Sequence, residues 1–314
     1  MTNPPSIITP SEWRSALEAL PATSNRIPAF FFGHGSPFLA FPLGEVRSGM
    51  GGYAGPTGPL ATFLKDFGPA LLKKYEPKGV VVFSAHWETP GERLVTDYGD
   101  ENPLLMDYFG FQPALYELKF KSKGDPTLSR RVVQLFETSG QAARTTSNME
   151  HRGQDGRGYP GPGLDHGVFI PFRLMFGEEF MTIPIVQVSI DSSLSPKTNW
   201  SVGKAIERLR EEGILVLAGG LTVHNLRDMS SFAPATAKPV YVEFNDAVTM
   251  AVTLPDAEER KQALMNLIKH PGFRTAQPRE DHLVPLYVAA GAGETGGVRI
   301  ITSLYGAQTF AFGV

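Results

Sequence analysis

Three strongly apolar runs, each followed by a histidine, constrain the fold of this chain more than any other feature. The runs cover residues 28–32, 80–83 and 214–218, and the histidines that follow them are His34, His86 and His224. A short, uninterrupted apolar run bounded by turn residues is typical of a strand buried on both faces of a sheet. A histidine beyond such a strand is poorly placed for core packing and well placed to point into a crevice. The pattern therefore predicts buried strands that bring histidines to one edge of a sheet.

Helical patterns lie between these runs. Thr9 and Glu12 form a capping box, which predicts a short helix to about residue 20, and Asp125, Pro126 and Gly140 mark the two ends of another helix. Apolar periodicity predicts further helices at 60–72, 195–213, 256–269 and 281–290, and strands at 183–190, 299–304 and 308–312. Strands that alternate with helices favour an α/β fold. We expect a single domain with a largely parallel or mixed central sheet, flanked by helices on both faces.

Composition excludes several classes of protein. The 314 residues are enough for one large α/β domain, and the formal net charge of −3, with both signs interspersed, gives no nucleic-acid footprint. The chain has no cysteine, which excludes disulfides and thiolate metal sites and leaves histidine and carboxylate as ligands. We see no signal peptide and no apolar run of membrane-spanning length. A cytoplasmic, soluble protein is the default expectation.

Two further histidines join the first three. His282 falls in the first turn of the predicted final helix, and His166 falls on a loop just before an apolar segment. Each of the five alone would be better interpreted as a capping or core histidine. Because five of the seven histidines stand at the ends of elements, a shared metal or acid–base site is the stronger hypothesis. His270 is interpreted as a cap of a helix C-terminus. His151, in a glycine-rich loop, stays undecided between a solvated and a functional residue, with the solvated role favoured.

Other polar residues near these positions have two possible roles. Glu280 and Asp281 could bind metal beside His282, but acidic residues at a helix start also complement the helix dipole. Arginines 152, 157 and 173 could hold a substrate carboxylate, since arginine matches carboxylates in bidentate fashion, although surface arginines are common. Residues 43–58 and 150–163 are interpreted as glycine-rich loops. The aromatic, irregular segment 102–120 is interpreted as lining or covering a part of the molecule that the sequence does not identify.

Five short motifs resemble those of a known family. In chain order they are residues 33–37 (GHGSP), 84–87 (SAHW), 165–167 (DHG), 223–226 (VHNL) and 280–287 (EDHLVPLY). In this order they resemble the class III extradiol ring-cleavage dioxygenases, and within them the 4,5-DOPA dioxygenase-like branch. The resemblance runs from about residue 28 to residue 304. It implies an N-terminal extension with a short helix at residues 1–27, followed by a catalytic domain at 28–314.

The resemblance implies a bound divalent metal, which is Fe(II) for ring cleavage and Zn(II) in some isolated forms. Carried over by motif, His34, His86 and His282 would bind the metal. His224 matches a position regarded either as a metal ligand or as the base beside the metal. His166 matches a histidine that takes part in acid–base chemistry or contacts the substrate. In the lignin-related branch the last ligand is a glutamate, whereas His282 occupies that region here.

The predicted function is a non-haem, metal-dependent extradiol dioxygenase that cleaves the ring of a DOPA-like or related catechol with dioxygen. Three protein ligands leave positions on a metal open for substrates, and a histidine that titrates near neutrality suits the proton transfers. Two alternatives remain open, a zinc-dependent hydrolase that uses metal-bound water and a non-catalytic, peptide-binding adaptor on the same fold. The intact histidines argue against the adaptor. We expect no nucleic-acid or membrane partner.

Overall fold

The structure is a computed structural model that describes residues 5–22, 26–45, 52–152 and 161–314. Its helices are α1 (Pro10–Glu18), α2 (Pro59–Tyr75), α3 (Pro126–Thr138), α4 (His166–Phe176), α5 (Pro196–Ala205), α6 (Pro239–Val252), α7 (Ala257–Asn266), α8 (Phe273–Ala276) and α9 (Val284–Ala292). Its strands are β1 (Ala29–Gly33), β2 (Gly79–Thr89), β3 (Glu92–Thr96), β4 (Lys121–Ser122), β5 (Ala142–Thr146), β6 (Glu179–Phe180), β7 (Ile185–Asp191), β8 (Ile214–Gly220), β9 (Val298–Thr302) and β10 (Thr309–Phe312).

A large mixed sheet forms the centre of the molecule. Among the described residues it has eight strands in the order β5-β3-β7-β2-β8-β1-β10-β9, and β4 pairs separately with β6. The four central strands, β7, β2, β8 and β1, are parallel, while β10 and β9 extend the sheet in antiparallel fashion. This confirms the predicted α/β class with a mixed sheet. Within the described part of the chain, no helix has the length and apolar character needed to cross a membrane.

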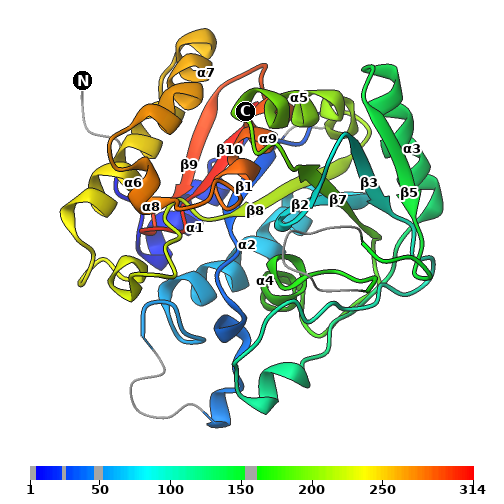
Figure 1. The fold of residues 1–314 in the computed structure, drawn as a ribbon, viewed down its shortest axis with the longest axis horizontal. Coiled ribbons are helices and arrows are strands. Elements are labelled where there is room, and N and C mark those ends of the chain that lie inside the picture. The colour runs from blue at the N-terminus through cyan, green and yellow to red at the C-terminus, as the bar shows by residue number, and fades with distance from the viewer. Residues whose placement is uncertain (1–4, 23–25, 46–51, 153–160) are drawn as a thin grey trace.

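The apolar runs pack on both faces of the sheet. In β1, Phe31 contributes to one hydrophobic core, while Phe30 and Phe32 contribute to the other. Side chains alternate between faces along a strand, so a strand covered on both sides must be apolar throughout. Figure 1 shows α5 and α9 on one side of the sheet and α2 and α4 on the other. The continuous apolar character of these strands therefore follows from the two helical layers.

Some elements escaped prediction from sequence. The six predicted helices correspond to α1, α2, α3, α5, α7 and α9, and the closing strands to β9 and β10. The helix predicted at 195–213 is shorter in the structure, because α5 ends at Ala205 and a 3-10 helix follows at Glu207–Arg210. The strands β3 and β5 and the helix α6 were not predicted. Since β5 is an edge strand with alternating exposed and half-buried residues, it lacks the apolar run that marks the central strands.

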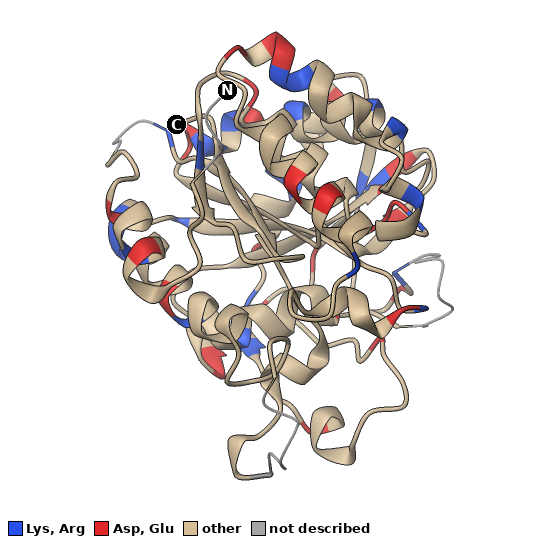
Figure 2. Ribbon diagram, turned by 90° about the vertical axis from the view of Figure 1, so that its left-hand side faces the viewer, with Lys and Arg blue, Asp and Glu red and all other residues tan. Residues whose placement is uncertain are grey.

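The N-terminal helix packs against the main body. Trp13 is almost fully buried, and its indole nitrogen donates a hydrogen bond to Asp66 of α2 at 2.8 Å. The backbone N–H of Ile7 donates to Ser303 near β9 at 2.7 Å. The boundary expected after residue 27, between an N-terminal extension and a catalytic domain, stays a prediction. The helix α1 contributes buried side chains to a hydrophobic core that also includes residues of β1. Figure 2 shows basic and acidic residues interspersed over the ribbon.

Candidate metal centre

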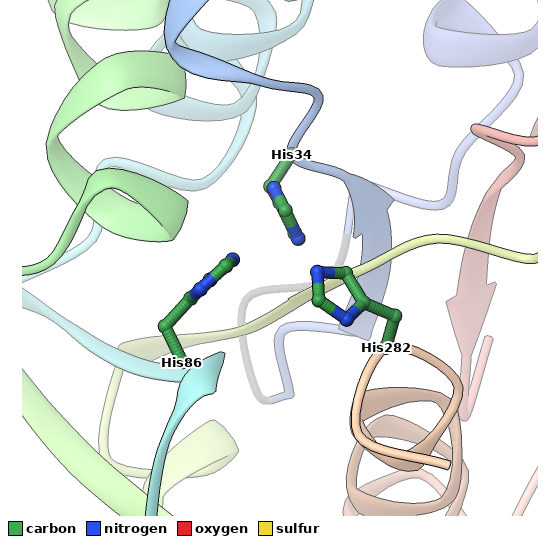
Figure 3. Close-up of side chains that lie close together, drawn as sticks. All are labelled: His34, His86 and His282. Carbon is green, nitrogen blue, oxygen red and sulfur yellow. The ribbon is translucent and has the colours of Figure 1, made fainter. Parts of the chain in front are cut away.

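Three histidines from separate parts of the chain converge at one edge of the sheet. His34, His86 and His282 point toward one another (Figure 3), and each offers a ligand atom within 4.8 Å of the others. Their ring centroids are 5.0 Å apart for His34 and His86, 5.2 Å for His34 and His282, and 5.0 Å for His86 and His282. All three side chains are buried. Buried imidazoles in this arrangement form a donor set suited to a divalent metal.

His34 stands where the sequence places it, directly after β1. Its backbone N–H donates to the carbonyl of Gly220 at 3.2 Å, which continues the parallel pairing of β1 with β8 by one residue. The strand thus fixes the position of the His34 backbone at the carboxyl end of the sheet.

His86 lies inside a strand, whereas the prediction placed it beyond one. β2 continues to Thr89, and its pairing with β7 changes register between Phe83 and Glu88. Pairing with β8, however, ends at Ser84. The prediction stopped the strand too early because the polar residues after Phe83 hid its irregular continuation. His86 therefore lies in the stretch where β2 has left its neighbour β8.

His282 precedes the last helix, and the predicted helix start at Asp281 is wrong. The helix α9 begins at Val284, with Pro285 in its first turn, where proline needs no N–H partner. The carbonyl of His282 accepts a hydrogen bond from the N–H of Leu221 at 2.8 Å. A side chain on Gly220 would lie 2.4 Å from that carbonyl oxygen, so glycine permits this close approach.

His166 is the first residue of α4, which corrects the prediction of a loop position. Asp165 caps this helix by accepting from the N–H of Gly167 at 2.9 Å. A side chain on Gly167 would lie 2.7 Å from a ring carbon of His86, so glycine lets the start of the helix lie against that histidine. The rings of His166 and His86 are 3.9 Å apart. His166 thus flanks the three converging histidines.

Asp107 lies between His86 and His166, and the sequence did not identify it as a site residue. It lies in the irregular aromatic segment, and its side chain is fully buried. One carboxylate oxygen is 2.8 Å from Nδ1 of His166 and accepts from the backbone N–H of the same residue at 2.8 Å. The other oxygen is 3.4 Å from Nδ1 of His86. The only signal in the sequence was the aromatic character of the surrounding segment, which gave no reason to choose this carboxylate.

His224 lies face to face with His282. The two rings are 3.5 Å apart at an interplanar angle of 13°. The backbone N–H of His224 donates to Ala276 at 2.8 Å, which ties the segment after β8 to α8. His224, Asp281 and His282 offer ligand atoms within 4.8 Å of one another, in a second group that shares His282 with the group of His34 and His86. The geometry therefore favours His224 as a neighbour of the three histidines.

Acidic residues and one arginine lie behind His282. Asp281 is 3.1 Å from Nδ1 of His282 and 3.1 Å from Arg279. Arg279 also binds both carboxylate oxygens of the buried Glu88, at 2.6 and 2.7 Å. Burial alone would lower the pKa of Arg279, but its hydrogen bonds to Glu88 and the charge of Asp281 raise it. The arginine therefore links β2 to the turn that carries His282.

A buried ion pair supports His166 from the other side. Arg152 and Asp165 are both fully buried and lie 2.6 Å apart. Asp165 also accepts from Ser84 at 2.6 Å and from Gln187 at 2.5 Å. Burial would raise the pKa of Asp165, but the Arg152 charge and these hydrogen bonds hold it below its usual value. Arg152 is therefore engaged by Asp165 in the protein interior, which argues against the alternative that it holds a substrate carboxylate.

We expect Arg152→Met to destabilise the protein by roughly 3–5 kcal/mol, since removing one partner of a buried pair leaves the other charge uncompensated. Arg144→Met is the matched control, because Arg144 pairs with the half-exposed Glu92 and should cost under about 1 kcal/mol. Urea unfolding of both variants measures the difference, and equal losses would contradict this account. Because the Asp165 pKa is lowered, its stabilisation is complete above the usual aspartate pKa of about 4 and is lost as the pH falls through the lowered value.

The remaining candidate residues have structural partners or lie elsewhere. His270 is the cap of a short 3-10 helix and accepts a hydrogen bond from the N–H of Gly272, which agrees with its interpretation as a cap. His151 is exposed. Arg173 binds the carbonyl of Lys119 and the carboxylate of Glu178. Arg157 and parts of both glycine-rich loops, residues 46–51 and 153–160, lie outside the described residues.

Comparisons with known proteins identify the family of the chain. Residues 28–312 match the family described as the catalytic LigB subunit of aromatic ring-opening dioxygenase. The chain is 38% identical over 303 residues to a 4,5-DOPA dioxygenase extradiol-like protein of Schizosaccharomyces pombe, covering 96% of this chain and 97% of that one. It is 29% identical to a 4,5-DOPA dioxygenase extradiol of Beta vulgaris, covering 90% and 94%.

The fold also matches a solved structure. An uncharacterised protein from Escherichia coli K12 superimposes with a TM-score of 0.63 at 24% identity, covering 92% of this chain and all of that one. At this identity the likeness supports the fold alone. The family match covers both the central sheet and every converging histidine. This chain therefore belongs to the LigB family of aromatic ring-opening dioxygenases, in the 4,5-DOPA dioxygenase-like branch of the class III extradiol superfamily.

Proposed function

We propose that this protein is an Fe(II)-dependent extradiol dioxygenase that cleaves the ring of a DOPA-like or related catechol. The observation that carries the proposal is the convergence of three buried imidazoles, which come from the residue after β1, from β2 and from the turn before α9. Family membership implies an extradiol dioxygenase-like enzyme with a metal cofactor. The names of the relatives, which specify 4,5-DOPA, suggest the class of substrate.

In this proposal His34, His86 and His282 hold the metal. Three neutral imidazoles suit both iron and zinc, so Zn(II) is the expected competitor for the site. When bound, Fe(II) supplies open coordination positions and redox chemistry between a catechol and dioxygen. The protein's own contribution is to hold the ligands buried and converging, and to place two further histidines beside them.

His166 is the proposed proton-transfer residue. An ionised carboxylate only accepts hydrogen bonds, so the Nδ1 atom that faces Asp107 carries a hydrogen. The other ring nitrogen of His166 can then accept a proton from a substrate hydroxyl and return one as the ring opens. The position of His166 beside His86 keeps this nitrogen close to the metal ligands.

His224 is proposed to assist as a base and to be dispensable for holding metal. We expect His224→Ala to retain most of its metal, because the His224 ring stacks on His282 and leaves the group of three intact. Ring cleavage should slow by about a hundredfold, as is typical for loss of a general base. Leu226→Ala, at an exposed neighbouring position, is the control and should behave like wild type. Loss of metal from His224→Ala would instead identify His224 as an obligatory ligand.

The proposed function is tested by anaerobic reconstitution with ferrous iron, followed by oxygen-uptake measurements with a panel of catechols. Each catechol is matched with the monophenol that lacks one of its two adjacent hydroxyls. The proposal predicts oxygen uptake and a yellow product with at least one catechol and none with its monophenol. Iron-loaded protein that consumes no oxygen with any catechol of the panel would contradict it.

A further inference from the structure

We infer that Asp107 is a positioning residue that fixes two imidazoles at once, those of His86 and His166. The inference rests on the proposed function for the roles of these two histidines, one as metal ligand and one as proton-transfer group. Its structural basis is the pair of contacts from one fully buried carboxylate, 2.8 Å to Nδ1 of His166 and 3.4 Å to Nδ1 of His86.

The carboxylate determines which ring nitrogen carries the hydrogen. Because Asp107 offers only acceptors when ionised, the Nδ1 atom of His166 that is hydrogen-bonded to it carries a hydrogen. The second carboxylate oxygen has no hydrogen-bond partner among the described residues and lies 3.4 Å from Nδ1 of His86, so it favours a hydrogen on that nitrogen as well. A neutral imidazole with its hydrogen on Nδ1 has its lone pair on the other nitrogen, which is the form that binds a metal. Partners of this kind orient metal-binding histidines and strengthen them as ligands. Asp107 thus prepares His86 for metal and His166 for proton acceptance.

The backbone around Asp107 explains how an irregular segment holds the carboxylate in place. Leu104 and Leu164 form an isolated parallel bridge, in which the N–H of Leu105 donates to Leu164 and the N–H of Leu164 donates to Pro103, both at 2.8 Å. The bridge lies directly before the Asp165 cap and His166. The segments that carry Asp107 and His166 are therefore joined to each other a few residues before the two side chains meet.

A second contact limits movement of the same ring. Tyr108, the neighbour of Asp107, packs edge-on against His166, with ring centroids 5.6 Å apart and planes at 90°. The Tyr108 hydroxyl donates to the carbonyl of Leu115 within its own segment. Asp107 and Tyr108 together hold His166 from two directions.

Asp107→Asn separates the two functions of the carboxylate. The oxygen near His166 accepts both from the His166 backbone N–H and from its ring, so the single amide oxygen of asparagine is best placed there. The amide NH₂ group then faces His86 and donates to its Nδ1. His86 must carry its hydrogen on the other nitrogen, the one needed for metal. We therefore expect zinc affinity to fall roughly 10- to 100-fold, the usual effect of losing such a partner.

Two measurements without catechol turnover test this inference. Competition with a chromophoric chelator gives the zinc affinity, and long-range ¹H–¹⁵N correlation spectra of metal-free, histidine-labelled protein give the tautomer of each ring. The His86 signals, assigned with a His86→Gln variant, should change from the Nδ1–H to the Nε2–H form in Asp107→Asn, while His166 keeps its form. Asp191→Asn is the control, since Asp191 is a partly buried aspartate that pairs with Arg93.

Each outcome has a distinct meaning. Unchanged zinc affinity and unchanged His86 signals in Asp107→Asn would overturn the inference, as would the same loss of affinity in Asp191→Asn. Two zinc ions bound per wild-type chain, with one lost in Asp107→Asn, would also overturn it, because Asp107 would then itself be a ligand with His86 and His166. The predicted zinc and NMR results, obtained with an enzyme that cleaves no catechol, would support the inference and contradict the proposed function alone.

Discussion

Replacing any one of His34, His86 and His282 with alanine is expected to abolish stable metal binding while the protein stays folded. The three residues supply all the ligands of the proposed site, and two ligands hold a divalent metal far more weakly than three. The side chains lie at a strand end, in an irregular part of β2 and in a turn, so their loss removes little core packing. Metal content after reconstitution, with circular dichroism to verify folding, measures the effect.

Glu280→Gln is the matched control for these variants. Glu280 is next to the acidic partner of His282 in sequence, and its carboxylate pairs with Arg274. We expect this variant to keep its metal. If two of the three alanine variants kept metal contents near wild type, the ligand assignment would be wrong. Loss of metal in Glu280→Gln and not in His282→Ala would exchange the roles of these two residues.

His166→Phe is expected to retain metal and to lose turnover by about a hundredfold or more, the usual contribution of a general acid–base residue. Phenylalanine fills the buried space beside Tyr108 but can neither accept nor donate a proton. The measurements are metal content and the rate of oxygen uptake with the best catechol. His151→Phe, the same substitution at an exposed histidine, should leave both values near wild type. Unchanged turnover in His166→Phe would assign that residue a structural role.

The sequence predicted those parts of the fold that depend on local pattern. The strand before His34 was recognisable because a strand buried on both faces is apolar at every position. The helix α3 was recognisable because Asp125 caps it, Pro126 begins it and Gly140 follows it. Such signals lie within a few residues of the feature they specify. They also indicated that His34, His86 and His282 belong to one site.

Features that depend on distant contacts were not predictable. The extension of β2 through His86 depends on its irregular pairing with β7, which no local pattern encodes. The role of Asp107 depends on the bridge between Leu104 and Leu164, which are sixty residues apart in the chain. Arg152 looked like a surface arginine because its buried partner, Asp165, lies beyond a glycine-rich loop. Whether a charged side chain is buried depends on an oppositely charged partner that can lie far away in the sequence.

The central claim is that the chain inserts both atoms of dioxygen into a catechol, and labelled oxygen tests it most directly. Iron-reconstituted protein is incubated with a catechol under ¹⁸O₂, and the product is analysed by mass spectrometry immediately after mixing, before its oxygens exchange with water. We expect a ring-opened product that is heavier than the unlabelled one by two ¹⁸O atoms. A ring-opened product without ¹⁸O would contradict the account. So would label recovered only in the solvent water and not in the product.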